Sequence, residues 1–302
     1  MKHKLLFWRF FASLLLLAVS TLSWAYDFAV DGIYYSWNSD GTTLSVRQGL
    51  NFYAGDVIIP SNVTVFNNTY DVTSIGDYAF SDCTALTSIT IPSSVTSIGN
   101  YAFNSCSGLT SINLPESVNK IGNWSFCGCS GISSIVIPES VNNIGEGSFS
   151  NCTNLSSINI PGNVKILGDF LFSGCSSLTS VEIPNSVTTL GHSLFQGCTK
   201  LESIAIPNNV TSIGYWLFQD CMNLKSVLLP ANISVLPRGI FMGCTGLVSF
   251  TIPNSIITID VAAFRGCTGL VSVDIPKNVI SIGEYNQEIM GKTNVEIIPV
   301  IA

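Results

Sequence analysis

Hydrophobic and polar residues follow a pattern that recurs every 23 residues along most of the chain. In the segment 86–108, the polar residues Ser88 and Thr90 alternate with the apolar residues Ile89 and Ile91. An alternation with a period of two is typical of a strand that buries one face. Because the pattern returns in register and without insertions, the sequence predicts one parallel strand per repeat.

The rest of each repeat is expected to bring the chain back to the start of the next strand. Pro92 ends the strand, because proline lacks a backbone N–H and has a fixed φ. Val95 and Ile98 then place a second apolar pair on the returning side. Phe103 and Cys106 lie three residues apart, as on one helical or 3₁₀ turn. The predicted repeat is therefore a coil with two short strands and one short helical turn.

Proline, phenylalanine and cysteine fix the phase of the repeat. The prolines stand 23 residues apart at Pro92, Pro115, Pro138, Pro161, Pro184, Pro207, Pro230, Pro253, Pro276 and Pro299. Cysteines keep the same spacing at Cys83, Cys106, Cys129, Cys152, Cys175, Cys198, Cys221, Cys244 and Cys267. A phenylalanine precedes each cysteine by three residues. Such self-similarity indicates a solenoid, because one unit cannot bury its apolar face without its neighbours.

The motif Ile-Pro-x-x-Val-x-x-Ile-Gly-x-x-x-Phe-x-x-Cys-x-x-Leu resembles the BspA-like type of leucine-rich repeat, found in bacterial surface proteins. The resemblance covers about residues 57–299 and departs from the commoner Leu-x-x-Leu-x-Leu-x-x-Asn pattern, since proline follows the strand. It implies a leucine-rich-repeat solenoid of α/β repeats, mostly parallel β-structure with one short helical turn per repeat. Members of this family are secreted or surface-exposed, and some are adhesins that bind host matrix proteins or other cells.

Residues 1–25 are typical of a secretory signal peptide. A basic start is followed by an apolar core that ends at Val19, and Ser23 and Ala25 flank a cleavage site of the small-x-small type. The uninterrupted apolar run is shorter than the ~20 residues that span a bilayer, which disfavours a membrane anchor. The sequence predicts export and removal of this segment, leaving a mature chain without a transmembrane segment.

Residues 26–70 break the period and are expected to form an N-terminal β cap with an opened first repeat. The aromatic and β-branched segments 32–37 and 42–46 flank a turn signal at 38–41, which predicts a β-hairpin. A cap would cover the open end of the stack. An independent carbohydrate-binding module with exposed aromatic residues, such as Trp37, is the alternative interpretation.

Residues 71–302 are assigned to the solenoid, whose last repeat is degenerate. Pro237 and Asp260 replace the glycine that follows the second strand of the repeat, and the segment 285–290 lacks both the phenylalanine and the cysteine. Terminal repeats commonly differ in this way. A final strand is expected at 295–298.

Composition predicts an outer surface that is polar but weakly charged. Apolar residues make up 47% of the chain and charged residues only 10%. Removal of residues 1–25 leaves nine of the twelve basic residues and all nineteen acidic ones, a formal net charge of −10. This charge argues against nucleic acid as a partner.

The cysteines are expected to be buried free thiols. Equivalent side chains of neighbouring parallel strands lie ~4.8 Å apart, whereas a disulfide needs converging Cβ atoms about 3.5–4.5 Å apart. Cys127 takes a position that is polar in other repeats, so we expect it on the solvent side. Cys127 and Cys129 would lie on opposite sides of the backbone, which disfavours a metal site. The mature chain has one histidine, His192, and scattered carboxylates, so no catalytic residue or cofactor is predicted.

The outward face of the strands is the leading candidate for a contact surface. Only positions that differ between repeats can encode specificity in a solenoid. Exposed aliphatic residues beside charges favour a patch formed by Glu182, Glu202, Lys225, Leu228, Val248 and Val271. Neutral drift at a tolerant surface is the competing interpretation. The aromatic stripe of Tyr78, Tyr101 and Trp124 is the alternative surface, unless it serves packing alone.

Together these features favour an exported, non-enzymatic binding protein, expected to be an adhesin at the cell surface. Its ligand would be a protein or a glycan, with host extracellular matrix or a partner cell as the source. A passive structural or spacer protein of the cell envelope is the alternative.

Overall fold

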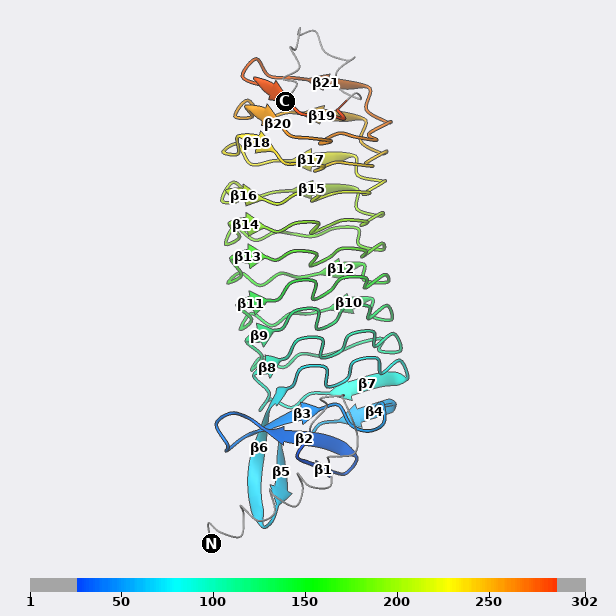
Figure 1. Ribbon diagram of the computed structural model, residues 1–302, viewed down its shortest axis with the longest axis vertical. Helices are drawn as coiled ribbons and strands as arrows, with labels where there is room; N and C mark the ends of the chain where they lie inside the picture. The colour runs from blue at the N-terminus through cyan, green and yellow to red at the C-terminus, as the bar shows by residue number, and fades with distance from the viewer. Residues whose placement is uncertain (1–25, 287–302) are drawn as a thin grey trace.

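The chain folds into a parallel β-solenoid. A computed structural model describes residues 26–286, and Figure 1 shows its coils stacked along one axis, with β1 (Phe28–Val30) and β21 (Ser272–Asp274) at opposite ends. Each of nine coils carries one fully buried phenylalanine, from Phe80 to Phe264. The predicted solenoid is therefore confirmed, while the signal peptide and the strand expected at 295–298 lie outside the described residues.

Two sides of the solenoid are parallel sheets. The front sheet contains the strands that precede the proline of each repeat: β4 (Gly55–Ile58), β7 (Leu86–Thr90), β10 (Ser134–Ile135), β12 (Ser157–Ile158), β15 (Ser203–Ala205), β17 (Ser226–Leu228), β19 (Ser249–Thr251) and β21. The back sheet contains the strands that follow it: β8 (Ser97–Ile98), β9 (Lys120–Ile121), β11 (Asn143–Ile144), β13 (Ile166–Leu167), β14 (Thr189–Leu190), β16 (Ser212–Ile213), β18 (Val235–Leu236), β20 (Thr258–Ile259) and β22 (Ser281–Ile282). Equal coil length keeps the sheets in register, so that Ser134 lies opposite Ser157.

The third side of each coil is called the turn side here. In the first coil it comprises residues 78–83, and the equivalent residues form it in the later coils. The N–H groups of Ser81 and Cys83 donate to carbonyls three residues back, whereas those of Tyr78, Phe80 and Asp82 donate to the next coil. A helix would use every N–H within its own turn. Residues 26–286 contain no helix, and the expectation of a short helical turn is wrong.

Left-handed backbone residues explain the absence of a helix. One row with positive φ comprises Tyr78, Tyr101, Trp124, Gly147, Phe170, Ser193, Trp216, Gly239, Ala262 and Tyr285, and a second comprises Asp82, Ser105, Gly128, Asn151, Gly174, Gly197, Asp220, Gly243 and Gly266. A non-glycine residue in this conformation costs about 1–2 kcal/mol. It also aims its N–H out of the coil, so that three N–H groups per coil bond to the next coil from Tyr78 through Gly243.

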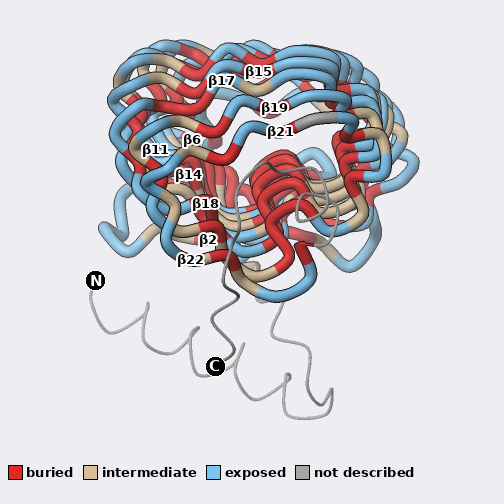
Figure 2. Tube along the Cα trace, turned by 90° about the horizontal axis from the view of Figure 1, so that it is seen from above, coloured by how far each residue is buried: buried red, intermediate tan, exposed pale blue. Residues whose placement is uncertain are grey.

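The core is built from ladders of identical residues. Phenylalanine rings of successive coils stack, with ring centroids 5.1 Å apart between Phe80 and Phe103. Each ladder cysteine from Cys106 onward donates its thiol to a phenylalanine carbonyl of the preceding coil, as Cys106 Sγ does to Phe80 O at 3.0 Å. All ten cysteines are free thiols, nine of them buried and Cys127 half-buried. Figure 2, seen along the stack, shows the buried residues on the inner side of the coils.

The N-terminal end is closed by antiparallel strands. The expected hairpin is present, because β2 (Ile33–Trp37) pairs with β3 (Leu44–Arg47), and β1 adds to its other edge. Tyr35 is fully buried, so this hairpin packs its aromatic residues into the end of the stack. A second hairpin joins β5 (Asn62–Val65) to β6 (Asn68–Ile75), and β6 continues into the back sheet.

Candidate binding surfaces

All residues predicted to bind a partner are exposed on the front side of the solenoid. These residues are Leu228, Val248, Val271, Glu182, Glu202 and Lys225. The exposed fractions of the first three, which are aliphatic, are 68%, 53% and 72% in that order. Their neighbours along the strand, such as Phe250, point into the core. Alternation along the strand therefore accounts for the outward side chains of Glu182 and Leu228, whereas Glu202, Lys225, Val248 and Val271 are exposed at the residue that precedes the strand position of their coils.

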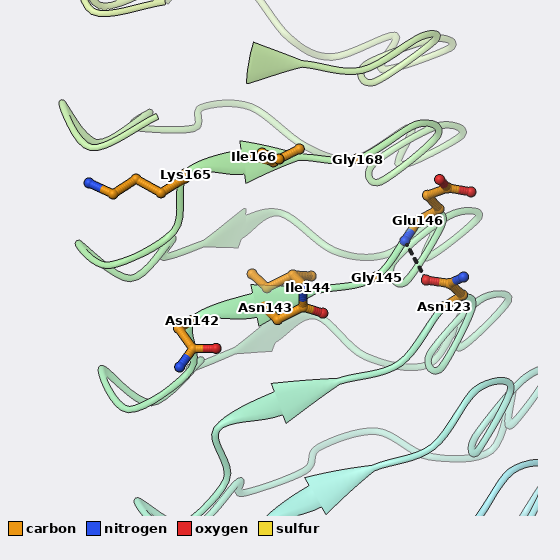
Figure 3. A pocket seen from close by; sticks show the side chains of 9 residues that line it. All are labelled: Asn123, Asn142, Asn143, Ile144, Gly145, Glu146, Lys165, Ile166 and Gly168. Carbon is orange, nitrogen blue, oxygen red and sulfur yellow. Dashed lines mark hydrogen bonds between the residues drawn. The ribbon is translucent and has the colours of Figure 1, made fainter. Parts of the chain in front are cut away.

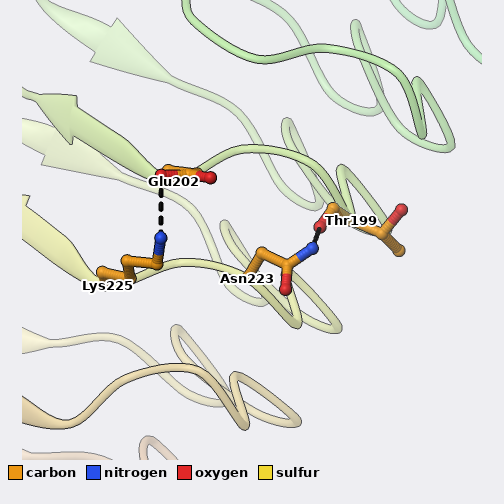
Figure 4. Close-up of polar contacts among 4 residues, drawn as sticks. All are labelled: Thr199, Glu202, Asn223 and Lys225. Atoms are coloured by element: carbon orange, nitrogen blue, oxygen red, sulfur yellow. Dashed lines mark hydrogen bonds and ion pairs between the residues drawn. The ribbon is translucent and has the colours of Figure 1, made fainter.

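Two of the predicted residues pair with each other. Lys225 Nζ lies 2.9 Å from Glu202 Oε2, one coil away, and both side chains are 62% exposed (Figure 4). Asn223 on the same coil donates to the Thr199 carbonyl at 2.8 Å. An exposed ion pair contributes ~0.2–1 kcal/mol to stability. This pair is therefore available for contact with a partner at little cost to the fold.

Glu182 and Leu228 line one shallow depression of about 640 Å³, with Ala205 on the coil between them. A second depression, of about 700 Å³, lies on the other side of Glu182 and reaches Val136. Val136 is 70% exposed and was not among the predicted residues. Residues 180–182 do not form the expected strand, so Glu182 lies on irregular backbone between the two depressions.

The aromatic stripe is engaged in packing between coils. The rings of Tyr78 and Tyr101 stack at 4.9 Å with an interplanar angle of 1°, and Trp124 follows Tyr101 at 6.5 Å. Gly147 interrupts the row, and the indole of Trp124 covers it and meets Phe170 at 6.0 Å. These contacts favour a structural role, since Tyr78 and Tyr101 stack on the ring of the next coil and Trp124 covers the backbone at Gly147.

An opening in the back sheet was not predicted from the sequence. It lies between β11 and β13 and has a volume of about 280 Å³. Figure 3 shows the polar side chains around it, which include Asn142, Asn143, Glu146 and Lys165. The only sequence signal is Glu146, which stands where Asn123 and Asp169 stand in the adjacent repeats.

The potential metal ligands and thiols of residues 26–286 are mostly dispersed or buried. No three of their His, Cys, Asp and Glu side chains gather as metal ligands would. Burial raises the pKa of the Cys175 thiol to about 12, which keeps it protonated and unreactive at neutral pH. The single described histidine, His192, accepts a hydrogen bond from the Tyr215 N–H at 2.8 Å on Nδ1.

Comparison with known proteins identifies the repeat. The sequence profile of the BspA type leucine rich repeat region, which comprises six copies, matches residues 59–179 and 165–288. The chain belongs to the BspA-type leucine-rich-repeat family. The fold and the Phe-x-x-Cys motif agree with this assignment, and no curated protein matches the chain.

Solved structures of bacterial leucine-rich-repeat proteins are similar to this chain. A leucine rich cell surface protein from Faecalibacterium prausnitzii is 26% identical, with a TM-score of 0.54 and coverage of 89% of this chain and 92% of its own. A leucine-rich repeat protein from Bacteroides ovatus is 30% identical, with a TM-score of 0.40 and coverage of 90% of this chain and 100% of its own. The first of these two proteins is thus described as a cell surface protein.

Residues 26–286 include no helix with the length and apolarity needed to cross a membrane.

Proposed function

We propose that this BspA-type chain is an exported, non-enzymatic adhesin that binds a protein or glycan of a host matrix or partner cell through its front sheet. The row of exposed, varying residues on the front side carries the proposal. Between Glu182 and Val271 it combines aliphatic side chains with a paired Glu202 and Lys225. An apolar centre with a polar rim is the usual composition of a protein interface.

The energetics of this face support a contact surface over a purely structural one. Leu228 and Val271 are exposed by 68% and 72%, so they gain little from folding but would gain on association. Replacing them with serine would leave the core unchanged. Several exposed apolar residues on one face are expected where a partner covers them.

The test is a triple variant, Glu202→Ser, Lys225→Ser and Leu228→Ser, in the mature protein. Its matched control, Glu116→Ser, Lys120→Ser and Val235→Ser, also removes one acid, one base and one aliphatic residue, all outside the front sheet. Binding to immobilised matrix proteins and to partner-cell surface extracts is measured by surface plasmon resonance. We expect at least a tenfold loss for the front-sheet variant and none for the control.

Two results would contradict the proposal. Equal binding by the parent and the front-sheet variant would exclude this face and make the aromatic stripe at Tyr78, Tyr101 and Trp124 the next candidate. A parent protein that retains nothing from either source would instead support the passive spacer.

A further inference from the structure

The back sheet opens at one step of an otherwise regular hydrogen-bond ladder. In the following coil, the Gly191 N–H donates to the Leu167 carbonyl at 2.8 Å, as the equivalent groups do at most steps. The Gly168 N–H should reach the Ile144 carbonyl in the same way, but it has no partner among the described residues. Strands β11 and β13 are consequently unpaired, and the sheet divides between them (Figure 3).

Glu146 distinguishes this step from the neighbouring ones. In this row, a short side chain accepts the backbone N–H one coil later: Asn123 Oδ1 accepts from Glu146 N at 3.1 Å, and Asp169 Oδ1 accepts from His192 N at 2.7 Å. The glutamate has one more methylene, and its Cγ lies 3.2 Å from the position that a Cβ on Gly168 would take. Its carboxylate therefore passes the Asp169 N–H without accepting it.

The opening is confined to the back sheet. On the turn side of the same two coils, the N–H groups of Gly147, Phe149 and Asn151 all donate to the next coil, at 2.8, 3.1 and 2.7 Å. The second division of the back sheet, between β16 and β18, has a different cause, because Pro237 lacks the N–H. The opening at Glu146 is thus local, because the turn side of the same two coils keeps its hydrogen bonds between coils.

The lining offers both donors and acceptors and no dominant charge. The side chains of Asn142, Asn143, Glu146 and Lys165 make no hydrogen bond or ion pair with the described residues, and the Gly168 N–H is also free. Figure 3 shows Glu146 and Lys165 at opposite ends of the opening.

These groups select among ligand classes. Glu146 attracts a cation at one end and Lys165 attracts an anion at the other, so the opening as a whole favours neither sign of net charge. An apolar ligand would leave the Gly168 N–H unpaired and desolvated, which is unfavourable. A ligand with several hydroxyls satisfies donors and acceptors alike. The 58% exposed side chain of Ile166 adds an apolar edge for C–H groups.

We propose that the opening between β11 and β13 is a second binding site, which takes a neutral pyranose unit of a glycan. The volume of about 280 Å³ lies at the lower end for ligand sites, which suits one ring rather than a larger molecule. The site is on a different side from the front-sheet candidates, so it stands independently of the proposed adhesin surface.

The test uses saturation-transfer difference NMR on the mature protein. The neutral probes are methyl β-galactoside, methyl α-mannoside and N-acetylglucosamine, and the charged probes are N-acetylneuraminic acid and glucosamine. We expect saturation of at least one neutral probe, with a dissociation constant of about 1 mM because one small ring has few contacts. The charged probes should give weaker signals.

Three variants connect the signal to the opening. Glu146→Asn supplies the short acceptor found in neighbouring coils, so it should close the ladder onto the Asp169 N–H, raise the denaturation midpoint and reduce binding at least tenfold. Asn143→Ser and Lys165→Thr introduce residues that occupy the same rows in other coils, and each should weaken binding without loss of folding. Glu116→Asn, a matched charge change elsewhere, should bind as the parent does.

The proposal fails if no neutral probe is saturated, if Glu146→Asn binds undiminished or unfolds at a lower midpoint than the parent, or if a charged probe binds best. None of these outcomes depends on the front-sheet triple variant, so the two proposals can fail separately.

Discussion

Truncation of one ring in the phenylalanine ladder should destabilise the whole solenoid. Phe172 is fully buried and stacks on Phe149 at 6.1 Å and on Phe195 at 5.7 Å. Phe172→Ala loses ~1.5–3 kcal/mol of side-chain burial and two ring contacts worth ~0.5–1.5 kcal/mol each. The sum agrees with the ~3–5 kcal/mol measured for such truncations in other proteins.

The assay is urea denaturation of the chain from residue 26 onward, followed by circular dichroism and tryptophan fluorescence. Because each coil contacts mainly its neighbours, a weakened central coil should also divide the transition, with a smaller denaturant slope than the parent. A double-mutant cycle tests the ladder itself. Phe172→Ala and Phe195→Ala share a contact and should be non-additive, whereas Phe172→Ala and Phe264→Ala should add. A loss below ~1 kcal/mol for Phe172→Ala, or full additivity of the adjacent pair, would refute the stacking argument.

Two further predictions concern the thiols and the left-handed row. Burial raises the pKa of Cys83 and Cys175 from 9.0 to about 12, so the unfolded chain loses these thiol protons at a lower pH than the folded chain does. The free energy of unfolding, measured by urea titration at fixed ionic strength, should therefore fall as pH rises from about 9 to about 12. A flat profile over that window would show that the thiols are not buried. Gly147→Ala should lower the free energy of unfolding by ~1–3 kcal/mol more than Gly197→Ala, because both glycines have positive φ but only a Cβ at Gly147 would overlap the Trp124 ring. Equal denaturation midpoints of the two variants would show that the indole does not cover Gly147.

The sequence was sufficient to predict the coil because the 23-residue period and the pattern of polar and apolar residues agree from repeat to repeat. Ile89 and Phe103 are buried and Thr90 is exposed, as alternation predicts. The helical turn was wrong because a spacing of three between Phe103 and Cys106 fits both a helix and a chain of turns with alternating hydrogen-bond direction. The distinguishing signal was the glycine that recurs in the left-handed rows, at Gly147 among others.

The candidate sites were predictable only in part. Outward positions follow from strand alternation, so the exposure of Leu228 could be inferred, whereas Val271 precedes β21 and has the parity of the buried Val273. The opening at Glu146 could not, because the repeat pattern treats Asp169 and Glu146 as equivalent polar positions. The two side chains differ by one methylene, and only Asp169 accepts the backbone N–H of the next coil.

The coil-to-coil bonds of the turn side also determine how the molecule would respond to mechanical tension. They run along the stack and recur three at a time, so a pull between the two ends applies the same force to every set, and the sets break one after another. One freed coil of 23 residues releases about 80 Å of extended chain. A tethered molecule of this kind would lengthen in discrete steps, beginning where the back sheet is already divided, and would limit the force transmitted to its attachment.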